Sequence, residues 1–201
     1  MNSDQSDLPV RVIERSLGPE SVINDDSRYS VDGRPIPVAV RPKNIDDIRS
    51  ILSESHAHDV KVMPVGGGTR LSLGNAAQTP DIALYTTSLN QPVSINSADL
   101  TATFEAGMTL DSVQSILAEN NQFLAMDSAL SNNATIGGIL ASGTSGPLKW
   151  QYGNPRDLVL GMKVVQADGS ITKSGGQVVK NVSGYDLARL HIGGLGTLGV
   201  I

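Results

Sequence analysis

The sequence contains no cysteine and few aromatic residues, and its charge balance is acidic. Without cysteine, disulfides, thiolate metal sites, iron–sulfur ligation and cysteinyl attachment of a cofactor are excluded within these 201 residues. Aromatic residues make up 3% of the chain and the formal net charge is −5. Nucleic-acid-binding surfaces need clustered basic residues and stacking rings. We therefore expect no nucleic-acid partner and no metal centre.

Long hydrophobic runs are also absent. No apolar stretch reaches the roughly 18 residues that would span a bilayer, and residues 1–12 lack the basic and apolar regions of a signal peptide. The composition is otherwise that of a globular protein, with 39% hydrophobic residues, 21 glycines and 10 prolines. We expect a soluble, cytoplasmic protein with many tight turns and no transmembrane segment.

The first half of the chain alternates strand and helix patterns. Residues 38–40 (VAV) predict a buried strand, and Asn44 is a suitable N-cap for an amphipathic helix ending near residues 56–59. Residues 60–65 predict a second strand, which runs directly into three glycines, and residues 81–87 predict a third. A strand, helix and strand in this order predict parallel strands.

The second half favours antiparallel pairing. Strands are predicted at 92–96 and 101–107, followed by a helix capped by Thr109, and Asp168-Gly169 predicts a hairpin. We expect an α+β fold with a partly irregular N-terminal segment (1–36), a small α/β lobe with parallel strands (37–90), and a larger lobe with a mainly antiparallel sheet and flanking helices (91–201). The apolar ending LGTLGVI suggests that the chain is truncated.

Three clusters of glycine and small polar residues stand out: VGGGT (65–69), DSALSNNATIGGILASGTSG (127–146) and IGGLGTLGVI (192–201). Consecutive backbone N–H groups that no side chain crowds can bind an anion, and a phosphate or pyrophosphate fits such a loop. Gly137-Gly138 at a helix start would expose further N–H groups. Each cluster alone could equally be a tight turn or a close packing contact. Neither the Rossmann fingerprint nor a Walker loop is present.

The three clusters, in this order, resemble the FAD-binding domain of the vanillyl-alcohol oxidase and p-cresol methylhydroxylase (PCMH) family of FAD-linked oxidases. The resemblance spans about residues 37–201, and VVKNVSGYDLARLHIGGLGTLGVI (178–201) is most similar to the glycolate oxidase and D-lactate dehydrogenase type, the FAD-binding subunit of bacterial glycolate oxidases above all. It implies a two-lobed PCMH-type fold with FAD bound between the lobes.

The resemblance also implies which residues bind the cofactor. The first loop would wrap the pyrophosphate, the T-I-G-G region would contact the flavin and the phosphates, and the final G-V-I strand would contact the adenine or the flavin edge. The implied FAD-binding residues are Gly66, Gly67, Gly68, Thr69, Arg70, Gly74, Asn75, Ser128, Thr135, Ile136, Gly137, Gly138, Ser142, Ser145 and Val200.

Two departures from the family qualify what the resemblance implies. Members with covalently bound flavin often carry a histidine in or beside the first loop, whereas this chain has Thr69 and Arg70 there, so non-covalent FAD is expected. The family's C-terminal cap domain, which shapes the substrate pocket, has no counterpart in these residues. The catalytic base and the group that clamps the substrate are therefore not identifiable.

The activity implied is oxidation of a 2-hydroxy acid such as glycolate or D-lactate, with hydride transfer to flavin N5. The fragment alone is expected to be inactive, and flavin and iron–sulfur partner subunits of an oxidase complex are implied. The alternatives are another activity of the same family, on alditols or aromatic alcohols for example, or a non-catalytic scaffold subunit. His191 is expected to be a hydrogen-bonded structural histidine, and Trp150 and Tyr152 are expected to pack in the core or at a rim.

Overall fold

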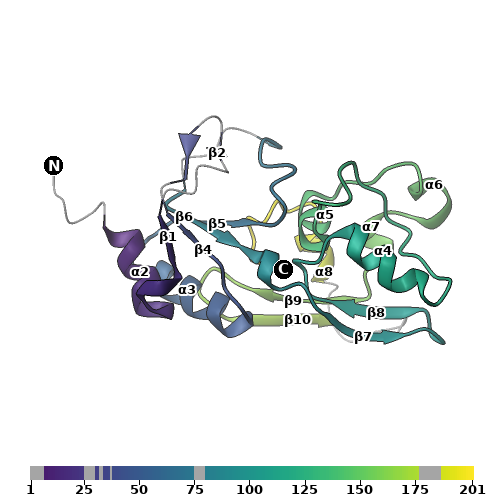
Figure 1. Ribbon diagram of the computed structural model, residues 1–201, viewed down its shortest axis with the longest axis horizontal. Coiled ribbons are helices and arrows are strands. Elements are labelled where there is room, and N and C mark those ends of the chain that lie inside the picture. Colours follow the sequence, from purple (N-terminus) through teal and green to yellow (C-terminus); the bar gives the residue numbers. More distant parts are fainter. Residues whose placement is uncertain (1–6, 25–29, 32–33, 37, 75–79, 177–186) are drawn as a thin grey trace.

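The computed structural model describes residues 7–24, 30–31, 34–36, 38–74, 80–176 and 187–201 (Figure 1). Its first sheet has the strand order β1 (Val22–Asn24), β4 (Val38–Val40), β6 (Ile82–Tyr85) and β5 (Val62–Val65). β6 pairs in parallel with both β4 and β5, and β1 is antiparallel to β4. The predicted parallel strands are confirmed, with β6 inserted between the two that the helix connects.

The connecting helix is α3 (Ile45–Ala57), and it begins where its cap predicts. The Asn44 side-chain oxygen accepts a hydrogen bond from the Asp47 N–H at 2.9 Å, which satisfies one of the free donors of the first turn. Acidic residues at 46 and 47 complement the positive end of the helix dipole. Ile48, Ile51 and Leu52 then face the sheet and are buried.

The first sheet is buried on both faces. Alternate strand residues (Val38, Val40, Ile82, Leu84) form a cluster with α3 and with α2 (Leu8–Leu17). Residues of the opposite parity, including Ala39, Ala83 and Tyr85, form a second cluster. An all-apolar strand such as VAV fits this position, because neither face meets water. The sequence prediction missed α2 and β1, which add a helix and a strand to this layer.

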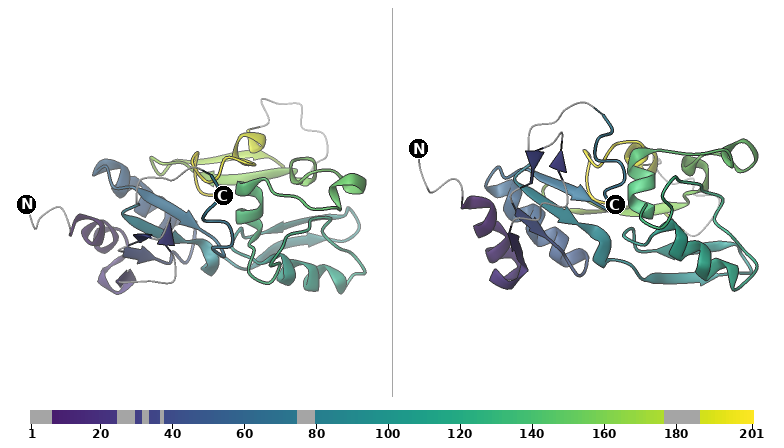
Figure 2. Two further views of the ribbon diagram at one scale, coloured as in Figure 1. Left: turned by 90° about the horizontal axis from the view of Figure 1, so that it is seen from above. Right: turned by 45° about the horizontal axis from the view of Figure 1, so that its top comes forward.

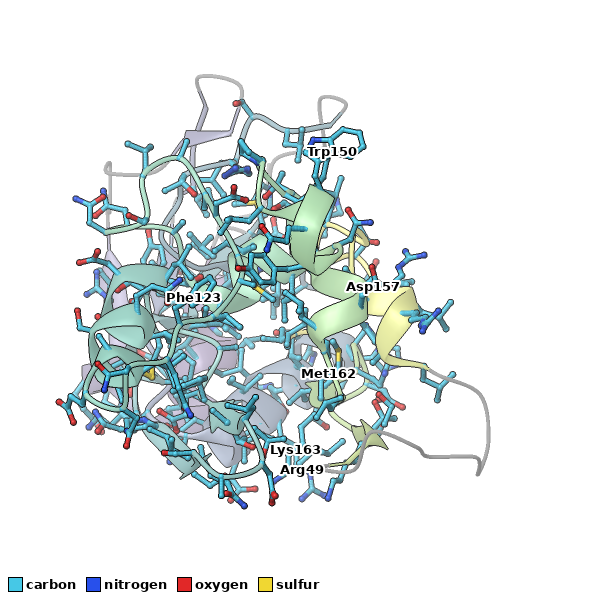
Figure 3. All side chains as sticks on the ribbon, turned by 90° about the vertical axis from the view of Figure 1, so that its right-hand side faces the viewer. Arg49, Phe123, Trp150, Asp157, Met162 and Lys163 are labelled. Carbon is cyan, nitrogen blue, oxygen red and sulfur yellow. The ribbon has the colours of Figure 1, made fainter. Side chains whose placement is uncertain are left out.

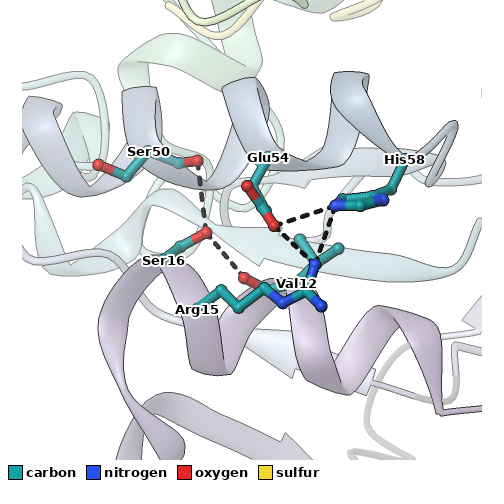
Figure 4. Close-up of polar contacts among 6 residues, drawn as sticks. All are labelled: Val12, Arg15, Ser16, Ser50, Glu54 and His58. Carbon is teal, nitrogen blue, oxygen red and sulfur yellow. Dashed lines mark hydrogen bonds and ion pairs between the residues drawn. The ribbon is translucent and has the colours of Figure 1, made fainter.

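α2 is held against α3 by polar as well as apolar contacts (Figure 4). The Arg15 guanidinium lies 3.2 Å from Glu54 Oε1 and 3.0 Å from His58 Nε2. The Ser16 hydroxyl donates to the Val12 carbonyl within its own helix, at 2.7 Å. Arg15 and His58 are too exposed for their contacts with the Glu54 carboxylate to contribute much stability. Burial of Val12 and Ile13 therefore contributes most to the packing of α2 on the rest of the protein.

The rest of the chain forms two antiparallel hairpins and several short helices (Figures 1 and 2). The first predicted hairpin is β7 (Pro92–Asn96) paired with β8 (Thr101–Phe104). The second is β9 (Gly161–Val165) paired with β10 (Ile171–Gly175), with Asp168-Gly169 in its turn. The other elements are α4 (Leu110–Ala118), α5 (Ile136–Ser142), α6 (Lys149–Tyr152), α7 (Pro155–Leu158), α8 (Ala188–His191), the 3-10 turns η1 (Pro19–Ser21) and η2 (Thr86–Ser88), and the short pair β2 (Ser30–Val31) and β3 (Arg34–Pro35). The predicted α+β class is confirmed.

The two predicted lobes share part of their cores. β9 packs against α3, and Val165 and Val200 belong to the same buried cluster as Ile48 and Ile51. Figure 1 shows α2 at one end of the molecule and β7–β8 toward the other, with β9–β10 running through the middle beside α3. Within the residues that the structure describes, no helix is long and apolar enough to cross a membrane.

Candidate functional site

The first glycine loop follows β5 directly and packs against the turn before α5. A Cβ added at Gly66 would collide with the Thr135 hydroxyl, and one added at Gly67 would overlap the Asn133 carbonyl oxygen. Gly68 has a φ of +69°, a left-handed conformation that favours glycine. The three glycines are therefore explained without a ligand, because two allow close packing and the third allows the chain to turn.

The same loop also leaves a row of hydrogen-bond donors unused. Among the described residues, none accepts a hydrogen bond from the backbone N–H of Gly67, Gly68, Thr69 or Arg70, and the side chains of Thr69 and Arg70 have no partner either. All of these residues are partly exposed. Consecutive free N–H groups beside a hydroxyl and a guanidinium form a site for a phosphate or diphosphate.

The start of α5 differs from what the sequence predicts. The N-cap is Thr135, whose Oγ1 accepts from the Gly138 N–H at 3.2 Å, as a helix start there requires. However, the Ile136 N–H donates to Met108 and the Gly137 N–H donates to Ala106, both at 2.8 Å. The expectation of exposed N–H groups at Gly137-Gly138 is wrong, because the Ala106 carbonyl accepts from the Gly137 N–H and the Thr135 hydroxyl accepts from the Gly138 N–H.

The third glycine cluster closes over the first two. The Gly193 N–H donates to Leu140 at the end of α5, and a Cβ on Gly143 would lie 3.0 Å from the Gly193 Cα. A Cβ on Gly74 would lie 3.4 Å from Leu195 Cδ1, and one on Gly196 would lie 2.9 Å from the Pro64 ring. Three segments that are far apart in the sequence thus meet at one place, as a shared site requires.

Two of the three predicted serine hydroxyls already donate to backbone carbonyls. Ser128 donates to Ala129 at 3.0 Å, and Ser142 donates to Ile139 at 3.1 Å and lies 3.0 Å from the Thr144 hydroxyl. Ser145 lies 3.5 Å from Asn154 Oδ1, which is too long for a strong bond. Among these three serines, Ser145 is therefore the one whose hydroxyl hydrogen is freest to turn toward a ligand.

Sequence reasoning did not single out Asp127. Its two carboxylate oxygens accept hydrogen bonds from the N–H groups of Gly146, at 2.5 Å, and Leu148, at 2.9 Å. This contact fixes the segment that follows α5, where Thr144 and Ser145 lie. No local pattern predicts it, because the partners are 19 and 21 residues away.

Three predicted residues add little evidence for the site. Both the N–H and the C=O of Val200 bond to Val165 at 2.9 Å, so the expected contact of its backbone with a cofactor is already replaced by an intrachain pair. Asn75 lies outside the described residues. Gly74 has a φ of +106° and is exposed.

Three further side chains differ from expectation or refine it. His191 is buried, at 8% exposure, but its ring makes no hydrogen bond to a described residue, and burial lowers its pKa. Trp150 is 86% exposed, so the expectation that it packs in the core is wrong. Tyr152 is also exposed, and it meets Phe123 edge to face, with ring centroids 5.5 Å apart.

A polar hollow of about 370 Å³ opens beside the glycine loop, lined by Gly67, Thr87, Asn90, Gly107, Met108, Thr109, Ser112, Asn132, Asn133 and Thr135. None of these side chains is charged. The site therefore fits a flavin dinucleotide in one respect and fails in another. The loop of Gly67–Arg70 offers a diphosphate donors that have no acceptor among the described residues, whereas the start of α5 does not.

Comparison with solved structures shows the fold. The chain matches an alkyldihydroxyacetonephosphate synthase with a TM-score of 0.81 at 18% identity, covering 100% of this chain and 39% of that one. It matches Phl p 4.0202, a glucose dehydrogenase, with a TM-score of 0.75 at 19% identity, covering 96% and 42%. At such identities the likeness extends to the fold alone.

Comparison with curated proteins gives nearer relatives. The chain is 36% identical over 168 residues to D-2-hydroxyglutarate dehydrogenase of Xanthomonas citri pv. viticola, covering 83% of this chain and 36% of that protein. It is 36% identical over 206 residues to glycolate oxidase subunit GlcD of Bacillus subtilis, covering 97% and 43%. The chain thus spans well under half the length of these relatives. Residues 36–175 match the FAD binding domain family, and the chain belongs to this family of FAD-binding proteins.

Proposed function

We propose that the chain is the FAD-binding part of a flavin-dependent oxidoreductase that oxidises a 2-hydroxy acid. The supporting observation is that relatives at 30–36% identity are named as oxidoreductases of such acids: glycolate, D-lactate and D-2-hydroxyglutarate. The free N–H groups of Gly67–Arg70 agree with this, because they give a dinucleotide a place to bind.

In this proposal the protein binds and orients the cofactor. The N–H groups of Gly67 to Arg70 donate to the diphosphate, and the Arg70 guanidinium neutralises part of its charge. Asp127 fixes the backbone that carries Ser145, so this hydroxyl can donate to a bound ring or phosphate. Bound FAD supplies flavin N5 as the hydride acceptor. The other predicted residues form the sides of the proposed FAD-binding site: Gly66, Gly74, Ser128, Thr135, Ile136, Gly137, Gly138 and Ser142.

Further features of the proposal concern attachment, location and partners. Binding is non-covalent, because the loop carries Thr69 and Arg70 where covalent members of the family often carry a histidine, and these 201 residues contain no cysteine. The protein is cytoplasmic and works with partner subunits of an oxidase complex, as the subunit name of the Bacillus subtilis relative suggests. The catalytic base and the substrate clamp lie outside these residues.

Titration with FAD tests the binding site. Purified protein should take up FAD, seen as flavin absorption and quenched flavin fluorescence, and acid precipitation should release all of the flavin into solution. Arg70→Ala should weaken binding by roughly 10–100-fold, since a charge-assisted bond contributes about 1.5–3 kcal/mol. Arg49→Ala, at an exposed position of α3, is the matched control and should bind normally.

Three results would contradict parts of this proposal. A folded protein that does not bind FAD would favour the alternative that the chain is a non-catalytic scaffold subunit. Flavin that stays with the precipitate would refute non-covalent attachment. If an active form of the protein turns over alditols but not glycolate, D-lactate or D-2-hydroxyglutarate, then the substrate class is wrong and the cofactor assignment stands.

A further inference from the structure

The short helix α6 carries the one tryptophan of the sequence into solvent. Trp150 is 86% exposed, although aromatic residues make up only 3% of the chain. Figures 1 and 2 show α6 at the end of the molecule far from α2, and Figure 3 shows Trp150 and Asp157 on the same side of the molecule. Tryptophan is enriched among the few residues that contribute most to protein–protein binding. The α6–α7 face is therefore a candidate interaction surface.

Two contacts from outside the helix hold α6 in place. A single helical turn is not stable by itself in water. The Leu148 N–H, at the start of α6, donates to the Asp127 carboxylate at 2.9 Å, and the Tyr152 ring packs edge to face on Phe123. The protein thus presents Trp150 on a fixed element, so little conformational entropy is lost when a partner covers this side chain.

This face also carries one cation and one anion that are not paired with each other. The Lys149 Nζ lies 5.5 Å from the centre of the Trp150 ring and makes no ion pair with a described residue. The Asp157 carboxylate accepts a hydrogen bond from the Asn154 N–H at 2.9 Å, within its own turn, and has no basic partner in the part of the chain that the structure describes. A two-fold axis brings residue i of each copy to residue j of the other. A face with one charge of each sign beside an aromatic side chain is therefore complementary to itself.

We propose that two copies of this chain associate through the α6–α7 face, with the two Trp150 side chains at the centre and Lys149 of each copy facing Asp157 of the other. A tryptophan side chain buries about 150–250 Å², so the two indoles alone would bury roughly 400 Å² at the centre of the contact. A specific interface buries about 1,200–2,000 Å² in total, and a polar rim commonly surrounds its aromatic centre. Formation of this dimer does not depend on bound FAD.

Sedimentation and tryptophan fluorescence test the dimer together. On dilution from about 1 mM to about 1 μM, the mass from sedimentation equilibrium should fall from dimer toward monomer. The tryptophan emission should move to longer wavelength over the same range, because the indole returns to water. Trp150→Ala should weaken dimerisation at least about 30-fold, as expected for a residue at the centre of an interface. Leu100→Ala is the matched control, because it removes another exposed apolar side chain, between β7 and β8, and should dimerise like the parent.

Charge reversal tests the pairing across the axis. Lys149→Glu and Asp157→Lys should each weaken dimerisation several-fold, and the double variant should recover most of the loss, because opposite charges then face each other again. Asp157 also caps α7, so if Asp157→Lys does not fold, Asp157→Asn keeps an acceptor oxygen without the charge and should weaken dimerisation instead. The dimer is refuted if the chain stays monomeric up to about 1 mM, if Trp150→Ala dimerises like the parent, or if the folded double variant dimerises no better than the single ones.

Discussion

Replacing Asp127 should destabilise the protein far more than its position in a loop suggests. Asp127→Ala removes a carboxylate that accepts two backbone hydrogen bonds, from Gly146 and Leu148. Hydrogen bonds to charged groups contribute about 1.5–3 kcal/mol each, and Asp127 is only partly buried, so the lower end applies. The expected loss is about 3 kcal/mol, which lowers the Tm of a chain of this size by roughly 6–12 °C.

Thermal and urea unfolding of the purified chain measure this loss. Glu119→Ala is the matched control, because this exposed carboxylate makes no hydrogen bond to a described residue and its removal should change stability by less than about 0.5 kcal/mol. Asp127→Asn should fall between the two, since an amide keeps one acceptor oxygen and places a donor where the second was. If Asp127→Ala unfolds within error of Glu119→Ala, then the carboxylate does not fix the segment after α5.

Three further predictions concern the glycine loop, the start of α5 and the buried histidine. Gly67→Ala should misfold or lose most of its stability in urea, because its Cβ overlaps the Asn133 carbonyl, whereas Gly176→Ala meets open space and should unfold like the parent. Thr135→Ala should cost about 1 kcal/mol of unfolding free energy through its lost N-cap, and serine at the same position should restore most of it. Burial lowers the pKa of His191, so the unfolded chain binds the proton more tightly and stability should fall as the pH drops below about 6.5. His191→Gln should flatten this part of the pH profile of urea midpoints, and an unchanged profile would show that another group is responsible.

Local signals in the sequence predicted most elements correctly. Asn44 and Thr109 cap the helices that they were expected to cap, and Asp168-Gly169 forms the expected turn. These features depend on neighbours within four residues, and such interactions are visible in one sequence. The N-terminal helix α2 was missed although its local signal is present, since Leu8, Val12, Ile13 and Leu17 recur at helical spacing, with Pro9 in the first turn and Gly18 directly after the last residue.

The site was predicted as a set of segments but not as a set of contacts. Glycine-rich stretches showed where the backbone comes close to something, and the structure shows that, at Gly66 and Gly67, the close partner is the turn before α5. Whether an N–H is free depends on acceptors far away in the sequence. The Met108 carbonyl accepts from the Ile136 N–H and the Ala106 carbonyl accepts from the Gly137 N–H. No rule of residue spacing could have predicted these hydrogen bonds.

Because Gly66 and Gly67 pack against the turn before α5, the conformation of the glycine loop is fixed by the protein itself. A loop whose shape is fixed by its own neighbours does not have to be ordered when an anion arrives, so little conformational entropy is lost at that moment. Its N–H groups already have the orientation that binding needs. Substitutions that loosen this contact should therefore reduce affinity even when every group that touches the ligand is retained.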